Sequence, residues 1–75
     1  MSYTKAQFAN ELERQLDQGY NPVTIARWAY QKHLGARAFE EGLEPEILKV
    51  VAMEEGPEFE MTEQELRELA SRLRT

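Results

Sequence analysis

The chain has 75 residues, a net charge of −5 and no cysteine. That length suits a single domain, residues 1–75, and a domain so small buries only about 60% of its unfolded surface. The lack of cysteine excludes disulfides, thiolate catalysis and cysteine-ligated metal centres.

The first expected helix covers residues 4–18. Thr4 and Gln7 have the spacing of a capping box, in which each side chain accepts from the other residue's backbone N–H. Phe8, Leu12 and Leu16 then recur every four residues and form one apolar face. Gly19 supplies the left-handed residue that commonly ends a helix.

The second expected helix covers residues 22–34. Asn21 is a good N-cap, and Pro22 suits the first helical position. Gly35 leaves two outcomes open, because glycine inside a helix costs about 1 kcal/mol relative to alanine. The helix either ends there or continues through Phe39, as far as residue 41.

The third expected helix covers residues 45–55, with Glu44-Pro45 opening it and Gly56-Pro57 ending it. Its apolar stripe is expected to be Ile47, Leu48, Val51 and Ala52.

The fourth expected helix covers residues 62–74. Thr62 and Glu65 form a second capping box, and the helix ends in arginines, which suit its negative C-terminus. No segment shows useful strand alternation, so we predict an all-α fold, a compact bundle of four short antiparallel helices. The expected core comprises Phe8, Leu12, Leu16, Ile25, Trp28, Ala29, Leu48, Val51, Leu66, Leu69 and Leu73.

Little in the sequence indicates catalysis. His33 is the sole histidine, and serine occurs only at Ser2 and Ser71, so no pairing of a nucleophile with a base is apparent. There is no glycine-rich phosphate loop, and no Glu-x-x-His pair of the kind used by dimetal bundles. We therefore expect no enzymatic activity, no cofactor and no bound metal.

The strongest candidate for binding is the stretch between the third and fourth helices. Glu54, Glu55, Glu58 and Glu60 surround Phe59 there, in a loop constrained by a Gly-Pro pair. Carboxylates would steer a basic partner toward the site, and an exposed aromatic would supply affinity. In the alternative interpretation, Phe59 and Met61 turn inward, with Met61 as a hydrophobic staple before Thr62.

A second candidate surface is the helix expected over residues 22–34 together with its extension toward residue 41. Arg27, Lys32, His33 and Arg37 are interleaved there with Trp28 and Tyr30, a pattern that can indicate nucleic-acid binding. Residues 16–29 also resemble the first half of a helix-turn-helix motif. An acidic helix follows instead of a basic recognition helix, so nucleic acid is the less favoured partner.

Charge and size suggest what kind of protein this is. Residues 1–37 carry a net +2 and residues 38–75 a net −7, an asymmetry that bears on partners rather than on fold. A small acidic four-helix bundle is similar to the immunity proteins that neutralise nuclease bacteriocins. We expect a non-enzymatic protein-binding module of the immunity, antitoxin, inhibitor or adaptor type. A homodimer, or a self-assembling subunit of a larger complex, is the other alternative.

The expected location is the cytoplasm. The N-terminus has no signal-peptide pattern, and no apolar run is long enough to span a membrane. The absence of cysteine also fits a reducing compartment.

Overall fold

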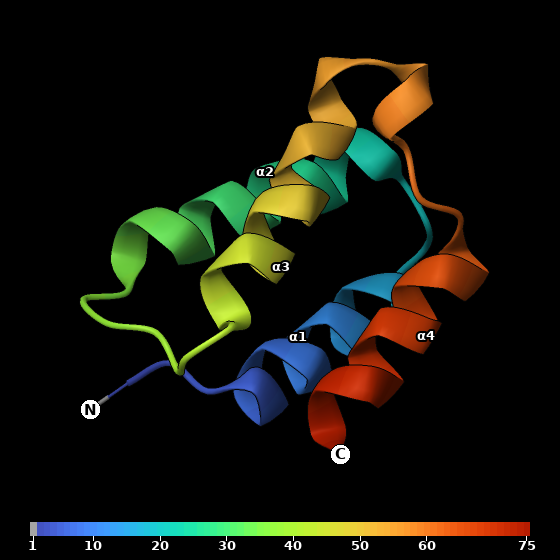
Figure 1. Cartoon of the computed structure of the whole chain (residues 1–75). Coiled ribbons are helices and arrows are strands. Elements are labelled where there is room, and N and C mark those ends of the chain that lie inside the picture. Colours follow the sequence, from blue (N-terminus) through green and yellow to red (C-terminus); the bar gives the residue numbers. More distant parts are fainter. Residues whose placement is uncertain (1) are drawn as a thin grey trace.

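The computed structural model describes residues 2–75 and contains four α-helices (Figure 1). Their bounds are α1 (Lys5–Asp17), α2 (Pro22–Gly35), α3 (Leu43–Val51) and α4 (Glu63–Arg74). Two short 3₁₀-helices, η1 (Ala52–Glu55) and η2 (Pro57–Phe59), connect α3 to α4. The predicted all-α fold is confirmed, and the described residues form one domain.

The predicted helix caps of α1, α2 and α4 are present. The Thr4 hydroxyl accepts from the N–H of Gln7 at 3.1 Å, and the Gln7 side chain accepts in return from the N–H of Thr4 at 2.9 Å. Thr62 and Glu65 repeat this box at the start of α4. The Asn21 side chain accepts from two backbone N–H groups of the first turn of α2. These local bonds satisfy donors that the helix itself leaves without partners.

The helix α2 ends at Gly35, so the alternative in which it continues through Phe39 is wrong. Ala36 has extended backbone angles, φ −88° and ψ 138°. Beyond it, Tyr3 and Phe39 form a single parallel β-bridge. The backbone of residues 38–40 is therefore occupied by the N-terminal segment, and it bonds there instead of within a longer helix.

The helix α3 begins at Leu43, two residues before the predicted start. Gly42 precedes it with φ +86°, a left-handed conformation that glycine adopts at low cost. Pro45 is consequently the third residue of the helix, where its missing N–H is not needed. This start turns Leu43, Ile47 and Val50 into the interior.

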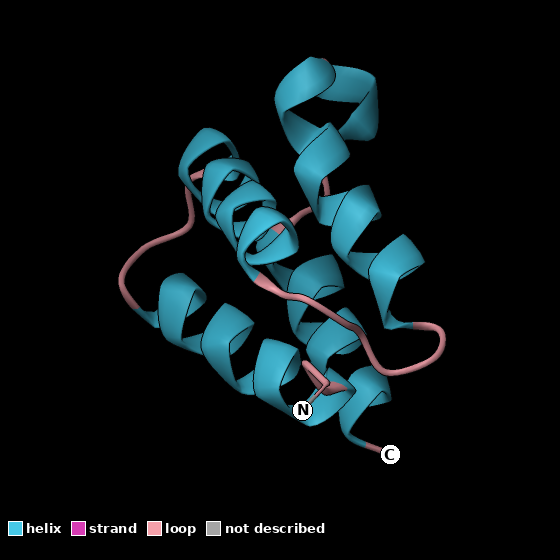
Figure 2. Cartoon of the chain, turned by 90° about the vertical axis from the view of Figure 1, so that its left-hand side faces the viewer, coloured by secondary structure: helices cyan, strands magenta, loops and turns pink. Residues whose placement is uncertain are grey.

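The helices pack as two pairs, α1 with α4 and α2 with α3, and α1 and α2 touch each other little. In both helix pairs the ion pairs join a later residue of one segment to an earlier residue of the other. Asp17 pairs with Arg67 and Glu13 with Arg74. Likewise, Arg27 pairs with Glu54 and His33 with Glu44. Figures 1 and 2 show the two pairs lying against each other across a common interior.

That interior is entirely apolar among the described residues. It contains Phe8, Ala9, Leu12, Leu16, Ile25, Ala26, Ala29, Leu43, Ile47, Val50, Met53, Leu66, Leu69, Ala70 and Leu73. Three predicted core residues differ: Leu48 is 45% exposed, and Trp28 and Val51 are half-buried at its edge. Trp28 stacks on Phe8 with 5.2 Å between ring centroids. The prediction for Leu48 is wrong because the buried face of α3 consists of Leu43, Ile47 and Val50, and Leu48 lies about 100° around the helix from Ile47.

The N-terminal segment ties the two helix pairs together. The backbone of Tyr3 donates to the Ala38 carbonyl at 2.9 Å and accepts from the Glu40 N–H at 2.8 Å. The Glu40 carboxylate in turn accepts from the N–H of Lys5, the first residue of α1, at 2.8 Å. One short segment thus links the start of α1 to the connection between α2 and α3. Within residues 2–75, no helix is both long and apolar enough to cross a membrane.

Candidate functional site

The five residues predicted to bind a partner lie on one ordered connection at one end of the molecule. We call residues 54–60 the acidic segment; in Figure 1 it is the orange turn that follows α3. The two 3₁₀-helices share this turn, with Gly56 extended between them. The Phe59 N–H donates to the Gly56 carbonyl at 3.0 Å, and the Glu60 N–H donates to the Pro57 carbonyl at 3.1 Å. The segment is held by its own backbone bonds rather than being an irregular loop.

Phe59 and Met61, for which two orientations were open, have different environments. Phe59 is 48% exposed and lies outside the core. Met61 is half-buried against the core, and its N–H donates to the sulfur of Met53 at 3.3 Å. The inward orientation is therefore confirmed for Met61 and wrong for Phe59, which presents its ring to solvent among the glutamates.

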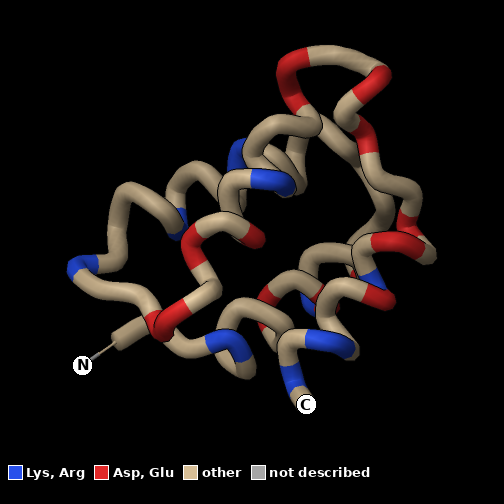
Figure 3. Tube along the Cα trace, viewed as in Figure 1, with Lys and Arg blue, Asp and Glu red and all other residues tan. Residues whose placement is uncertain are grey.

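The carboxylates of the acidic segment differ in their partners. Glu54 forms an ion pair with Arg27 of α2 at 2.9 Å. Glu55, Glu58 and Glu60 are exposed, and none of them has an ion-pair partner among residues 2–75. Figure 3 shows these negative positions following one another along the turn. Three carboxylates are thus left available to an external cation.

Tyr20 was not among the predicted site residues, yet it borders this end of the molecule. Its hydroxyl donates to the carbonyl of Met61. Desolvation raises the pKa of Tyr20, and the negative charges of Glu60 and Glu65 raise it further. The hydroxyl therefore stays protonated as a donor that ties the α1–α2 connection to the start of α4. The sequence offered only a weak signal, an aromatic inside the Gly-Tyr-Asn-Pro turn.

The basic residues of α2 do not form a continuous positive surface. Arg27 is paired with Glu54, and Lys32 lies 3.7 Å from a carboxylate oxygen of Glu11. The His33 ring is 2.9 Å from Glu44 and stacks on Phe39. Carboxylates of the same chain thus lie beside most of the basic side chains that suggested nucleic-acid binding. These carboxylates weaken the electrostatic attraction of the basic side chains for phosphate groups.

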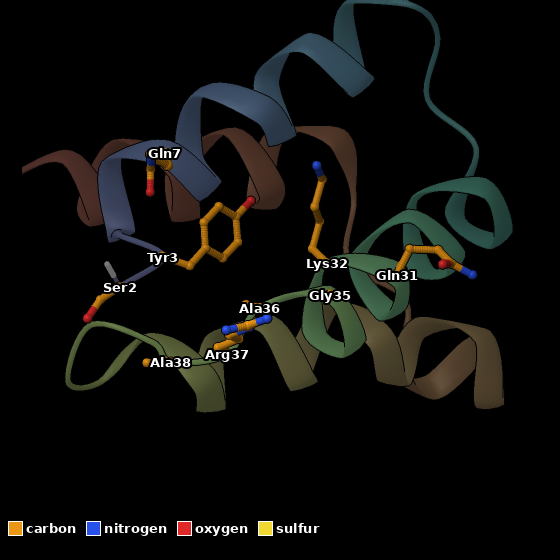
Figure 4. A pocket seen from close by; sticks show the side chains of 9 residues that line it. All are labelled: Ser2, Tyr3, Gln7, Gln31, Lys32, Gly35, Ala36, Arg37 and Ala38. Carbon is orange, nitrogen blue, oxygen red and sulfur yellow. The ribbon is translucent and has the colours of Figure 1, made fainter.

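A separate hollow of about 600 Å³ lies at the other end of α2. It is lined by Ser2, Tyr3, Gln7, Gln31, Lys32, Gly35, Ala36, Arg37 and Ala38. Figure 4 shows the Tyr3 ring and the Lys32 side chain on opposite sides of this hollow. None of the five predicted site residues lines it.

Two polar side chains of the hollow, Tyr3 and Lys32, contact Glu11, which does not line it. The Tyr3 hydroxyl donates to Glu11, the same carboxylate that Lys32 approaches. Burial raises the pKa of Tyr3, and the hydrogen bond and negative charge of Glu11 raise it further. Tyr3 therefore stays neutral at physiological pH and acts as a structural donor. Over the part of the chain that the structure describes, no group of three or more His, Cys, Asp or Glu side chains could hold a metal ion.

Comparison with protein-family models, with curated proteins and with solved structures finds no match to this chain.

Proposed function

We propose that this chain is a small protein-binding module that docks a basic partner protein through the acidic segment and its Phe59. The single observation that carries the proposal is an aromatic side chain, 48% exposed, among three carboxylates that have no ion-pair partner within the described residues. Aromatic anchors dominate many interfaces energetically, and charged rims speed the encounter and select the partner.

The order of the segment supports this proposal. Backbone bonds within the turn and the capping box at Thr62 restrict the chain on both sides of Phe59. The acidic segment would therefore lose less conformational freedom on binding a partner than a flexible loop would. The like charges of Glu55, Glu58 and Glu60 repel each other slightly and contribute nothing to the core. A binding role accounts for their presence better than a structural role does.

Immunity, antitoxin, inhibitor and adaptor roles all remain compatible with this chemistry, since each uses a preformed surface to recognise another protein. Nucleic acid is the weaker alternative. The carboxylates beside Arg27 and Lys32 already offset their charge, and phosphate binding needs several cations on one face.

The test replaces Glu58 and Glu60 by Gln and uses wild type and variant as baits for affinity purification from the native host. We expect stability within about 0.5 kcal/mol of wild type, because both side chains are exposed. The captured basic partner should associate more slowly with the variant, and the loss should be largest at low salt.

The matched control is Glu41→Gln with Glu68→Gln, which removes the same charge from exposed positions outside the acidic segment. That control should bind as wild type does. Equal binding by all three proteins would show that the acidic segment is only a solvated connection.

Phe59→Ala tests the anchor separately. The half-exposed ring should contribute less than about 1.5 kcal/mol to stability, against 3 kcal/mol or more for a fully buried phenylalanine. Affinity for the captured partner should fall by about tenfold or more, as for an interface anchor. Urea unfolding and surface plasmon resonance measure the two effects on the same protein.

A further inference from the structure

The helix α2 presents apolar side chains to solvent as well as to the core. Val23, Tyr30 and Leu34 are 42%, 47% and 60% exposed, and the side chain of Arg27 is 71% exposed. Positions 23, 27, 30 and 34 are spaced by four, three and four residues. At 3.6 residues per turn they fall within a sector of about 60° on one side of the helix. We call these four residues the α2 stripe.

The charge around this stripe limits what can cover it. Of the four helices that the structure describes, only α2 contains no Asp or Glu. The single charged member of the stripe, Arg27, is already balanced by Glu54. Two molecules that each carry −5 would repel each other over most of their surface. At α2 this repulsion is smaller, because α2 itself carries no carboxylate and Glu54, beside the stripe, is already paired with Arg27.

The α2 stripe has the same residue spacing when it is followed in either direction, so two copies can face each other antiparallel. When two copies of α2 cross antiparallel about a two-fold axis, positions whose numbers add up to 57 face each other. Val23 then lies against the partner's Leu34, and Arg27 lies against the partner's Tyr30. The first contact is apolar, and the second places a guanidinium beside an aromatic ring, a favourable pairing. A two-fold interface requires such self-complementarity.

We propose that the α2 stripe is the interface of a symmetric homodimer, with α2 of one copy packed antiparallel on α2 of a second. This surface is distinct from the acidic segment, and the proposal does not depend on the function suggested for that segment. A helix of 14 residues is about 21 Å long, so the interface lies at the small end of specific interfaces and the dimer dissociates readily. Each dimer would present two acidic segments.

The first test is sedimentation velocity of the whole chain from about 10 µM to about 1 mM. We expect a reversible rise from monomer to dimer mass. Val23→Glu combined with Leu34→Glu should weaken the dimer at least tenfold, because like charges then face each other at both ends of the interface. Circular dichroism checks that each variant remains helical.

The second test examines the register. Val23→Glu combined with Leu34→Lys removes the same apolar groups, but it sets an acid opposite the partner's lysine at both ends. This variant should dimerise at least tenfold more tightly than the double-Glu variant at low salt. Gln64→Glu with Ser71→Glu controls for net charge, since it adds the same two negative charges at exposed positions of α4. It should leave the dimer within about threefold of wild type, as for charges outside an interface.

A wild-type chain that stays monomeric at the highest concentration would overturn the proposal, whether or not another protein binds the stripe. Equal dimerisation of the Glu–Glu and Glu–Lys variants would also overturn it, because the two copies would then meet in another register or through another face. A loss of dimer in the α4 control equal to that in the double-Glu variant would likewise count against it, since net charge alone would account for the effect.

Discussion

Ile47 and Leu48 are adjacent aliphatic residues with opposite surroundings. Ile47 is fully buried, whereas Leu48 is 45% exposed. The sequence pattern alone does not separate them, because both belong to helical stripes of acceptable spacing. In the structure Ile47 shares the buried face of α3 with Leu43 and Val50, which lie four residues before it and three after it, whereas Leu48 lies about 100° away around the helix.

Matched alanine substitutions test this assignment. Ile47→Ala should lower the free energy of unfolding by about 2–5 kcal/mol, because it removes buried methyl groups and leaves a cavity. Leu48→Ala should cost less than about 1 kcal/mol, since much of that side chain already contacts water. Urea denaturation of the two variants measures both values, and equal losses would contradict the placement of α3.

Phe59 and Met61 are a second case in which similar apolar residues have different surroundings in the structure. Both are large apolar residues two positions apart, and the staple pattern correctly placed Met61 toward the core. Phe59 follows Gly56-Pro57, and the 3₁₀ turn there directs its ring outward. The exposure of that ring depends on the turn geometry, and a composition-based argument could not distinguish the two alternatives.

At the scale of the helix, Gly35 is the last residue of α2 and is open to substitution. Its φ is not positive, and an added Cβ would meet no atom within 4 Å. Gly35→Ala should therefore stabilise the chain by about 0.4–1 kcal/mol, because alanine restricts the unfolded chain more than glycine does. The contrasting variant is Gly42→Ala, at φ +86°, which should destabilise through backbone strain. Thermal unfolding compares the two, and a destabilising Gly35→Ala would show that the glycine is required where α2 ends.

The sequence of α2 has no single apolar face. Its apolar residues are distributed between the buried face and the α2 stripe, so no single apolar face stands out. The helices α1 and α4 carry one apolar face each, and their buried residues matched the sequence prediction closely. Among residues 2–75, only the buried face of α2 packs against the core, and the α2 stripe is exposed to solvent.

At the scale of the whole molecule, Tyr3 connects parts of the chain that are distant in sequence. Its backbone pairs with residues 38–40, its hydroxyl donates to Glu11, and its ring packs edge-on against Phe8. Because α1 and α2 have little direct contact, this segment contributes much of the connection between the two helix pairs beyond the shared core.

Substitutions at Tyr3 should therefore be costly for a residue so close to the N-terminus. Tyr3→Ala should lower stability by about 1.5–3 kcal/mol, and Tyr3→Phe by about 1 kcal/mol, since only the hydrogen bond is lost. Tyr30→Ala, at an exposed position, should stay within about 0.5 kcal/mol when measured at low protein concentration. A Tyr3→Ala variant as stable as Tyr30→Ala would mean that the N-terminal segment does not stabilise the fold.

Sequence patterns were sufficient to predict the helical class, the caps of α1, α2 and α4 and most of the core. Those features depend on contacts within a few residues, such as Thr4 with Gln7, or on periodicity within one helix. The folded structure was needed to establish where α2 ends, where α3 begins, which helices pair, and that Phe59 faces solvent. The end of α2 depends on contacts between distant segments, because Tyr3 binds residues 38–40 and that pairing competes with a longer α2. The pairing of the helices also joins distant segments. The outward ring of Phe59 depends instead on the backbone geometry of the 3₁₀ turn, which the apolar pattern of the sequence does not specify.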